Sequence, residues 1–200
     1  MRALTALPLL PVLVLLSGCF GSAPAVPKEQ YFRLIATVPA DQSPEKISGG
    51  LEVVPFDGEG VMSERPLLFT ADDGRKLEQR NYAYWTDAPP QMLRDQLVAY
   101  LKQAGVADSV APSELRLDSA YTIRGTIRRL EQMVGSGSGA VISLELAVME
   151  TSSDRLILSK VYTAEKPTSG DNIDGAVAAL NDGLDEIFTA FAGDLAAADF

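Results

Sequence analysis

Residues 84–105, YWTDAPPQMLRDQLVAYLKQAG, mark the point at which the pattern of the chain changes from strands to a helix. Pro89 and Pro90 stand near its start and Gly105 near its end, and proline favours the first turn of a helix as glycine favours its end. Between them, apolar residues recur at spacings of three and four, the period of one helix face: Leu93, Leu97, Tyr100, Leu101 and Ala104. The segment predicts an amphipathic helix over 89–104, with Trp85 in the core before it and Asp87 as its cap.

On the carboxyl side of this helix the apolar residues alternate with polar ones, which is typical of strands with one buried face. The first run covers 121–128 and the second 142–149, and a glycine-serine stretch at 135–139 joins them. Residues 151–154 (TSSD) then turn the chain into a third run over 156–164. These three runs predict an antiparallel meander.

The last segment carries an apolar stripe opposite Asp174, Asp182 and Asp185, which predicts a long helix on the surface of a core. The stripe consists of Ile173, Val177, Leu180, Leu184, Ile187, Phe188, Phe191 and Leu195.

On the amino side, residues 31–36 and 50–55 are short β-type runs, and residues 67–85 have the pattern of a hairpin around Asp73-Gly74. About 180 residues suffice for one hydrophobic core, whereas two smaller cores would each be marginal. The order of the elements therefore predicts a single α+β domain over 30–200, with a mixed or antiparallel sheet and two helices packed on one face.

Cys19 is the only cysteine of the 200 residues. A lone cysteine in an exported protein is a buried small hydrophobe, a reactive thiol or a site of modification. The positive start at Met1-Arg2 and the short apolar run over 3–16 predict a signal peptide over 1–18. Leu16-Ser17-Gly18-Cys19 resembles the lipobox of bacterial lipoproteins, in which the thiol is diacylglycerylated and the new amino terminus receives a further acyl chain such as palmitate. The alternative is an ordinary secretory signal peptide with a chance cysteine.

Several acyl chains on one residue form a stable membrane anchor. The proline- and alanine-rich linker over 19–29 would connect it to the domain, and no later stretch approaches the apolar length of a membrane helix. By analogy with enteric bacteria, mainly an Asp after the lipidated cysteine retains a lipoprotein in the inner membrane, and this chain has Phe20 there. We therefore expect a lipid-anchored protein at the periplasmic face of the outer membrane.

The composition excludes several classes of function. The formal net charge of −10 argues against nucleic acid or an anionic membrane surface as the main partner. The chain has no histidine, and a lipidated Cys19 leaves no free thiol, so the commonest zinc ligands and the usual general base are absent. We expect no catalytic residue, no metal site and no cofactor. Residues 135–139 lack the pattern of a nucleophile elbow and the lysine of a phosphate-binding loop.

Few charged residues stand out as candidate binding residues. The acid pairs Asp72-Asp73 and Asp185-Glu186 are interpreted as solvated charge. Arg124, Arg128 and Arg129 form a basic cluster that would suit a phosphate head group or an acidic partner, although the wet face of a strand has the same pattern. Arg124 and Met149 are predicted on outward faces of neighbouring strands, where a guanidinium and a thioether suit a partly apolar, partly anionic contact.

The segment quoted first also resembles a known family. An aromatic residue and Trp85, an acidic residue, proline and a helix beginning with Met92-Leu93 follow ERPLLF at 64–69 and DDGRKLEQ at 72–79. This order is similar to that of the ABC-type transport auxiliary lipoproteins, whose best-known branch is PqiC. YFRL at 31–34 matches the opening of the family, and the later strands and terminal helix match in order. Thr70 departs from the pattern, because a basic residue is expected after the aromatic one.

The resemblance implies a non-catalytic partner of an MCE-domain (mammalian cell entry) transport system, which moves phospholipid-like molecules between the inner and outer membranes. It implies docking or receiving at the outer membrane, with the periplasmic MCE protein as partner, a phospholipid as a further ligand and a homo-oligomer as one possible state. The alternative is a structural or assembly lipoprotein that stabilises or activates an envelope complex.

Overall fold

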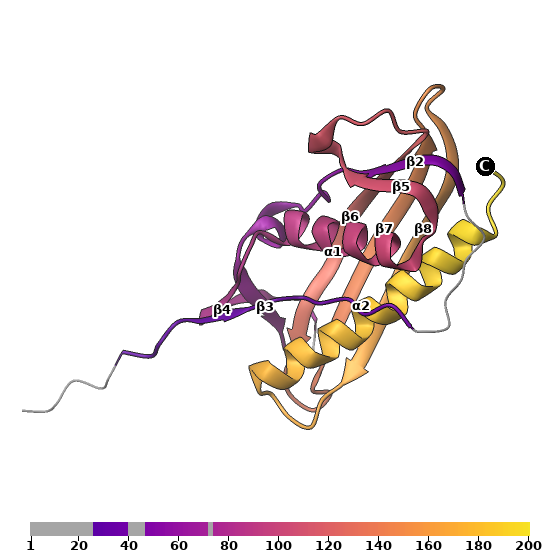
Figure 1. The fold of residues 1–200 in the computed structure, drawn as a ribbon. Helices are drawn as coiled ribbons and strands as arrows, with labels where there is room; N and C mark the ends of the chain where they lie inside the picture. The colour runs from indigo at the N-terminus through magenta and orange to yellow at the C-terminus, as the bar shows by residue number, and fades with distance from the viewer. Residues whose placement is uncertain (1–25, 40–46, 72–73) are drawn as a thin grey trace, which may run out of the picture.

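A computed structural model describes residues 26–39, 47–71 and 74–200. The predicted signal peptide, Cys19, the first part of the predicted linker and Asp72-Asp73 lie outside the described residues. Within the described part of the chain, eight strands form one sheet, and two α-helices lie on one of its faces (Figure 1). This is the α+β architecture that the sequence predicts.

The strand β6 (Tyr121–Met133) is hydrogen-bonded along both of its edges. On one edge it pairs antiparallel with β7 (Gly139–Glu150). On the other edge, β2 (Ile47–Val53) pairs parallel with its first residues and β3 (Pro66–Thr70) with its last. Between them, Asp57 donates its N–H to the carbonyl of Gly125 at 2.7 Å and accepts the N–H of Ile127 at 2.8 Å. β6 is therefore a central strand over its whole length.

The remaining strands extend the sheet on both sides. β4 (Leu77–Trp85) pairs antiparallel with β3, as predicted, and carries the short β1 (Gln30–Phe32) parallel at the edge. β8 (Arg155–Pro167) completes the predicted meander beside β7. β5 (Ala107–Pro112) lies parallel to β2 and was not anticipated from the sequence. The sheet is thus mixed.

Both helices form where the apolar periodicity predicts them. α1 spans Pro89–Ala104 and α2 spans Ile173–Ala196. Trp85 and Leu184 are buried in the core, with 1% and 0% of their surfaces exposed. The prediction that Asp87 caps α1 is wrong: Ala88 is the N-cap and makes no side-chain bond. Prolines fill the first two positions of the helix and have no N–H, so the usual need for a capping acceptor is reduced.

One glycine sets how closely α2 approaches the sheet. A Cβ atom on Gly183 would lie 2.8 Å from Ile142 Cγ2 and 3.3 Å from Ala164 Cβ, whereas one on Gly193 of the same helix would meet nothing within 4 Å. Both neighbours of Gly183 are themselves buried. The backbone of α2 therefore rests directly on β7 and β8 at this point.

We expect Gly183→Val to lower the free energy of unfolding by about 1–3 kcal/mol, because the added methyl groups push α2 off the sheet. Gly193→Val is the matched control and should leave stability within about 0.5 kcal/mol of wild type. Urea unfolding followed by circular dichroism measures both. Equal stabilities would contradict this packing.

Residues 33–38, which we call the strap, run across α2 and alongside α1 without regular secondary structure (Figure 1). Three consecutive backbone N–H groups of the strap donate to helix side chains: that of Ile35 to Asn181 Oδ1 at 3.0 Å, that of Ala36 to Gln96 Oε1 at 3.0 Å and that of Thr37 to Asp185 Oδ1 at 2.6 Å. Leu34 is buried beneath, with 1% of its surface exposed. The predicted strand over 31–36 is therefore wrong beyond Phe32: residues 31 and 32 belong to β1, and residues 33–36 belong to the strap.

Candidate functional site

The face of β6, β7 and β8 opposite the helices, which we call the outer face, holds both binding residues predicted from the sequence. Arg124 lies directly opposite Ala147, and Met149 lies opposite Thr122, two residues away from Arg124 on the same side of β6. Arg124 is exposed and Met149 is half-buried. The two side chains are thus diagonal neighbours, and their role in binding stays a prediction.

Two large apolar side chains of β8 extend the outer face. Leu156 is paired with Met149 and Val161 with Glu145, so both lie on the same side as Arg124. They are 57% and 53% exposed. Large apolar groups that folding leaves in water, on the same face as a cation, form a surface suited to a partner that is partly apolar.

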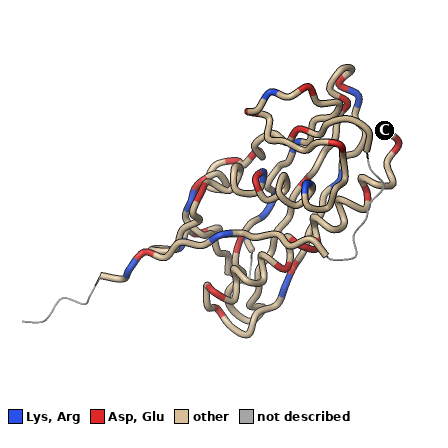
Figure 2. The backbone as a smooth tube through the Cα atoms, viewed as in Figure 1, with Lys and Arg blue, Asp and Glu red and all other residues tan. Residues whose placement is uncertain are grey.

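The three arginines do not form a cationic patch. Arg128 donates through Nε to Glu145 Oε2 at 3.0 Å, and this carboxylate raises the pKa of the guanidinium. Arg129 donates to Glu131 Oε1 through Nε at 3.0 Å and Nη2 at 2.6 Å. Of the three, only Arg124 has no ion pair with a described residue. Acidic and basic residues are both scattered along the backbone (Figure 2).

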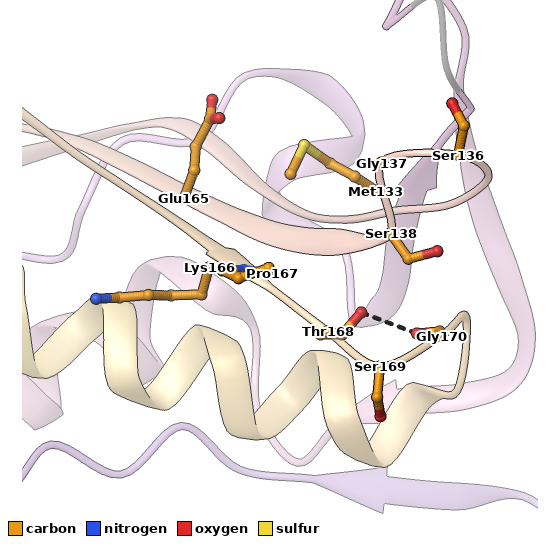
Figure 3. A pocket seen from close by; sticks show the side chains of 10 residues that line it. All are labelled: Met133, Ser136, Gly137, Ser138, Glu165, Lys166, Pro167, Thr168, Ser169 and Gly170. Carbon is orange, nitrogen blue, oxygen red and sulfur yellow. Dashed lines mark hydrogen bonds between the residues drawn. The ribbon is translucent and has the colours of Figure 1, made fainter.

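A cavity of about 740 Å³ lies between the loop after β6 and the loop after β8 (Figure 3). Met133, Ser138 and Thr168 are among its lining residues. Glu165 and Lys166 also line it, but their side chains point to different sides of β8 (Figure 3), and Lys166 Nζ is paired with Glu186. Its lining combines hydroxyl and backbone groups with the apolar side chains of Met133 and Pro167.

Asp171 fastens the 135–138 loop to the chain just before α2. Its carboxylate lies within hydrogen-bond distance of the Ser138 hydroxyl and accepts the N–H of Gly135 at 3.2 Å. These two donors, the hydroxyl first, lower the pKa of Asp171. A carboxylate with a low pKa is a weak base, so Asp171 is poorly suited to activate the Ser138 hydroxyl. The prediction that this stretch is a loop is confirmed.

A further cavity, of about 420 Å³, shares Met133, Ser136, Gly137 and Glu165 with the first and is also lined by Thr70 and Arg129. Thr70, the residue that departs from the family pattern, is buried with 3% of its surface exposed. Within the described residues, no three His, Cys, Asp or Glu side chains gather closely enough to hold a metal ion.

The acid pair Asp185-Glu186 was interpreted as solvated charge, but both residues have partners. Asp185 accepts the N–H of Thr37 in the strap, and Glu186 pairs with Lys166. Burial is the main cause of a raised pKa at Asp185. The side chains that accept hydrogen bonds from the strap were not predicted from the sequence. The spacing of Asn181 and Asp185, which places them one helical turn apart on α2, was the only hint of a shared role.

Two solved structures are similar in fold. One is a protein of Xanthomonas campestris assigned to the family DUF330, with 21% identity, a TM-score of 0.72 and an alignment that covers 82% of this chain and 93% of that one. The other is the crystal structure of an uncharacterized protein, with 19% identity, a TM-score of 0.67 and coverage of 84% of this chain and 99% of that one. A search among curated proteins found no match.

Among the described residues, no helix has both the length and the apolar character needed to cross a membrane. The family model of the ABC-type transport auxiliary lipoprotein component matches residues 35–192, which include most of the strap, all of α1, most of α2 and most of the sheet. The chain therefore belongs to the ABC-type transport auxiliary lipoprotein component family.

Proposed function

We propose that this protein is a non-catalytic auxiliary lipoprotein of an MCE/ABC-type intermembrane lipid transport system. Cys19 would anchor it at the periplasmic face of the outer membrane, and the domain would dock the periplasmic MCE protein. The observation that carries this proposal is the family match over 35–192, which is a match to an auxiliary transport component. The lipobox-like sequence before Cys19 supports the anchor.

The outer face is the proposed docking surface. It leaves Leu156, Val161 and Arg124 exposed, and none of the three belongs to the buried core of the described residues. A partner that covered this face would remove the apolar groups from water and bring an acceptor to the guanidinium. Docking would then depend on residues that the fold does not require.

The test is the double variant Arg124→Glu and Met149→Glu. It reverses the charge and places a carboxylate at the apolar part of the outer face, so we expect affinity for the MCE protein to fall about tenfold or more, which corresponds to about 1.4 kcal/mol. Lys102→Glu with Leu117→Glu is the matched control, since both residues are exposed and lie outside β6, β7 and β8. The control should bind like wild type.

Co-purification from detergent-solubilised envelopes measures binding, and the melting temperature of each variant shows that the fold is retained. Full binding by a well-folded double variant would remove the outer face from the proposal. Failure of the wild-type protein to co-purify with any MCE protein or lipid would favour the assembly-lipoprotein alternative.

A further inference from the structure

Tyrosine side chains gather where the chain enters the folded domain from the side of Cys19. Tyr31 of β1 lies opposite Tyr84 of β4, with ring centroids 5.8 Å apart. Tyr31 is 53% exposed, and Tyr82, two residues before Tyr84, is 39% exposed. Arg65 lies over the Tyr31 ring, 5.5 Å from its centroid. We call Tyr31, Tyr82 and Tyr84 the tyrosine edge, because β1 is the edge strand of the sheet.

Tyr82 has an unfavourable backbone conformation. Its φ is +63°, in the left-handed region that glycine and asparagine adopt readily and bulky residues avoid. The pairing of β3 with β4 is interrupted around it, because the partner of Pro66 is Tyr84 while that of Leu68 is Gln79. The extra residues of β4 between these two pairs form a bulge, and a bulge changes the direction in which a side chain points.

Packing of the Tyr82 ring in the core does not account for the strained backbone, because the ring is partly exposed. Its partial exposure limits the apolar surface that it contributes to the core, and asparagine at this position would meet the backbone requirement with less strain. Backbone strain of this type clusters at functional sites, so the conformation of Tyr82 motivates a search for a functional role.

The position of Cys19 limits how far the tyrosine edge can lie from a membrane. Cys19 precedes Tyr31 by twelve residues, a length that spans at most about 43 Å even when fully extended. A compact domain of this size is itself about 40 Å across. β1 is the first element of the described domain after Cys19, and any linker conformation shorter than full extension keeps it off the side of the domain that lies farthest from the bilayer.

We propose that the tyrosine edge lies in the lipid head-group region of the membrane that holds Cys19. Tyrosine has an apolar ring and a polar hydroxyl, which suits the boundary between lipid and water. The chain has a formal net charge of −10, so the contact rests on ring insertion rather than on attraction to anionic lipid. The inference depends on the proposed anchor at Cys19 but not on transport or on the MCE partner.

The experiment uses the full lipidated chain in phosphatidylcholine vesicles that contain a lipid with a nitroxide on its head group. Tyr82→Cys supplies a thiol for an environment-sensitive fluorophore, because a lipidated Cys19 does not react. Leu156→Cys is the control: it is 57% exposed and lies near the β7–β8 turn, far from β1 and β4 (Figure 1). We expect the nitroxide lipid to reduce emission at position 82 and to leave position 156 unchanged.

Equal emission loss at the two positions, or none at position 82, would overturn the proposal. Mass spectrometry of the vesicle-bound protein tests the anchor separately, and an unmodified Cys19 would also overturn it. Loss of MCE binding in the co-purification test leaves the quenching result unaffected, so the two proposals fail independently.

A second variant separates a surface role from a structural one. Tyr82→Asn relieves the backbone and removes the ring, so we expect a melting temperature equal to or above that of wild type. A fluorophore at Tyr31→Cys should then lose less emission in the Tyr82→Asn background than in its absence. A lowered melting temperature, or unchanged quenching at position 31, would show that Tyr82 serves the fold and not the membrane contact.

Discussion

Trp85→Ala is expected to lower the free energy of unfolding by about 3–5 kcal/mol. The indole is 1% exposed, and its removal leaves a cavity that the surrounding core fills only in part. The backbone of Trp85 also joins separate segments, since its N–H donates to the carbonyl of Arg65 at 2.7 Å and its carbonyl accepts Arg65 Nε at 3.0 Å. A domain has about 5–15 kcal/mol of stability in total, so much of it would be lost.

Two further variants make this result specific. Leu184→Ala removes a side chain with 0% exposure from the centre of the α2 stripe and should cost about 2–5 kcal/mol. Leu156→Ala, at 57% exposure, is the control and should stay within about 0.5 kcal/mol of wild type. Urea unfolding measures all three. The assignment of the core is wrong if Trp85→Ala and Leu184→Ala unfold at the wild-type midpoint.

Cys19→Ala is expected to move the protein from the membrane fraction to the soluble fraction. Each buried CH₂ of an acyl chain contributes about 0.8 kcal/mol, and a residue with more than one chain holds a protein stably on a membrane. Without the thiol there is no site for the diacylglyceryl group. Fractionation of the envelope, with mass spectrometry of the amino-terminal peptide, measures the change.

Leu117→Ala is the control for this experiment, because it changes an exposed residue outside the predicted lipobox and should leave the protein in the membrane fraction. A wild-type protein that is unmodified and soluble would contradict the predicted anchor, and with it the proposed localisation. Cys19 lies outside the described residues, so this prediction rests on the sequence.

The long helix and strands were predictable because apolar residues recur in them at a regular spacing, and this spacing identifies the face that is buried. The stripe of α2 and the alternation in β6 and β7 identify most of the residues that the structure buries there, although Ile173 and Tyr121 at the starts of α2 and β6 are only half-buried. β5 was missed since ADSVAP does not alternate, and its place is set by pairing with β2, more than fifty residues earlier. Such a contact leaves no local pattern.

For the candidate site, the sequence predicted which residues face outward but not which residues they contact. Alternation placed Arg124 and Met149 on an outward face, but the sequence did not give the register that sets Arg128 beside Glu145. The strap was missed for a related reason. Its N–H groups are satisfied by side chains of Gln96 and Asn181, and in the sequence these are ordinary polar residues on the wet side of a helix.

The strap also determines how the domain would carry mechanical load. A protein that is anchored at Cys19 and bound through its outer face is under tension whenever its partner moves away from the membrane. That force enters through β1, whose pairing with β4 covers three residues, and then through the strap. Because the strap is bonded to Gln96 on α1 and to Asn181 and Asp185 on α2, the pull is shared by two helices.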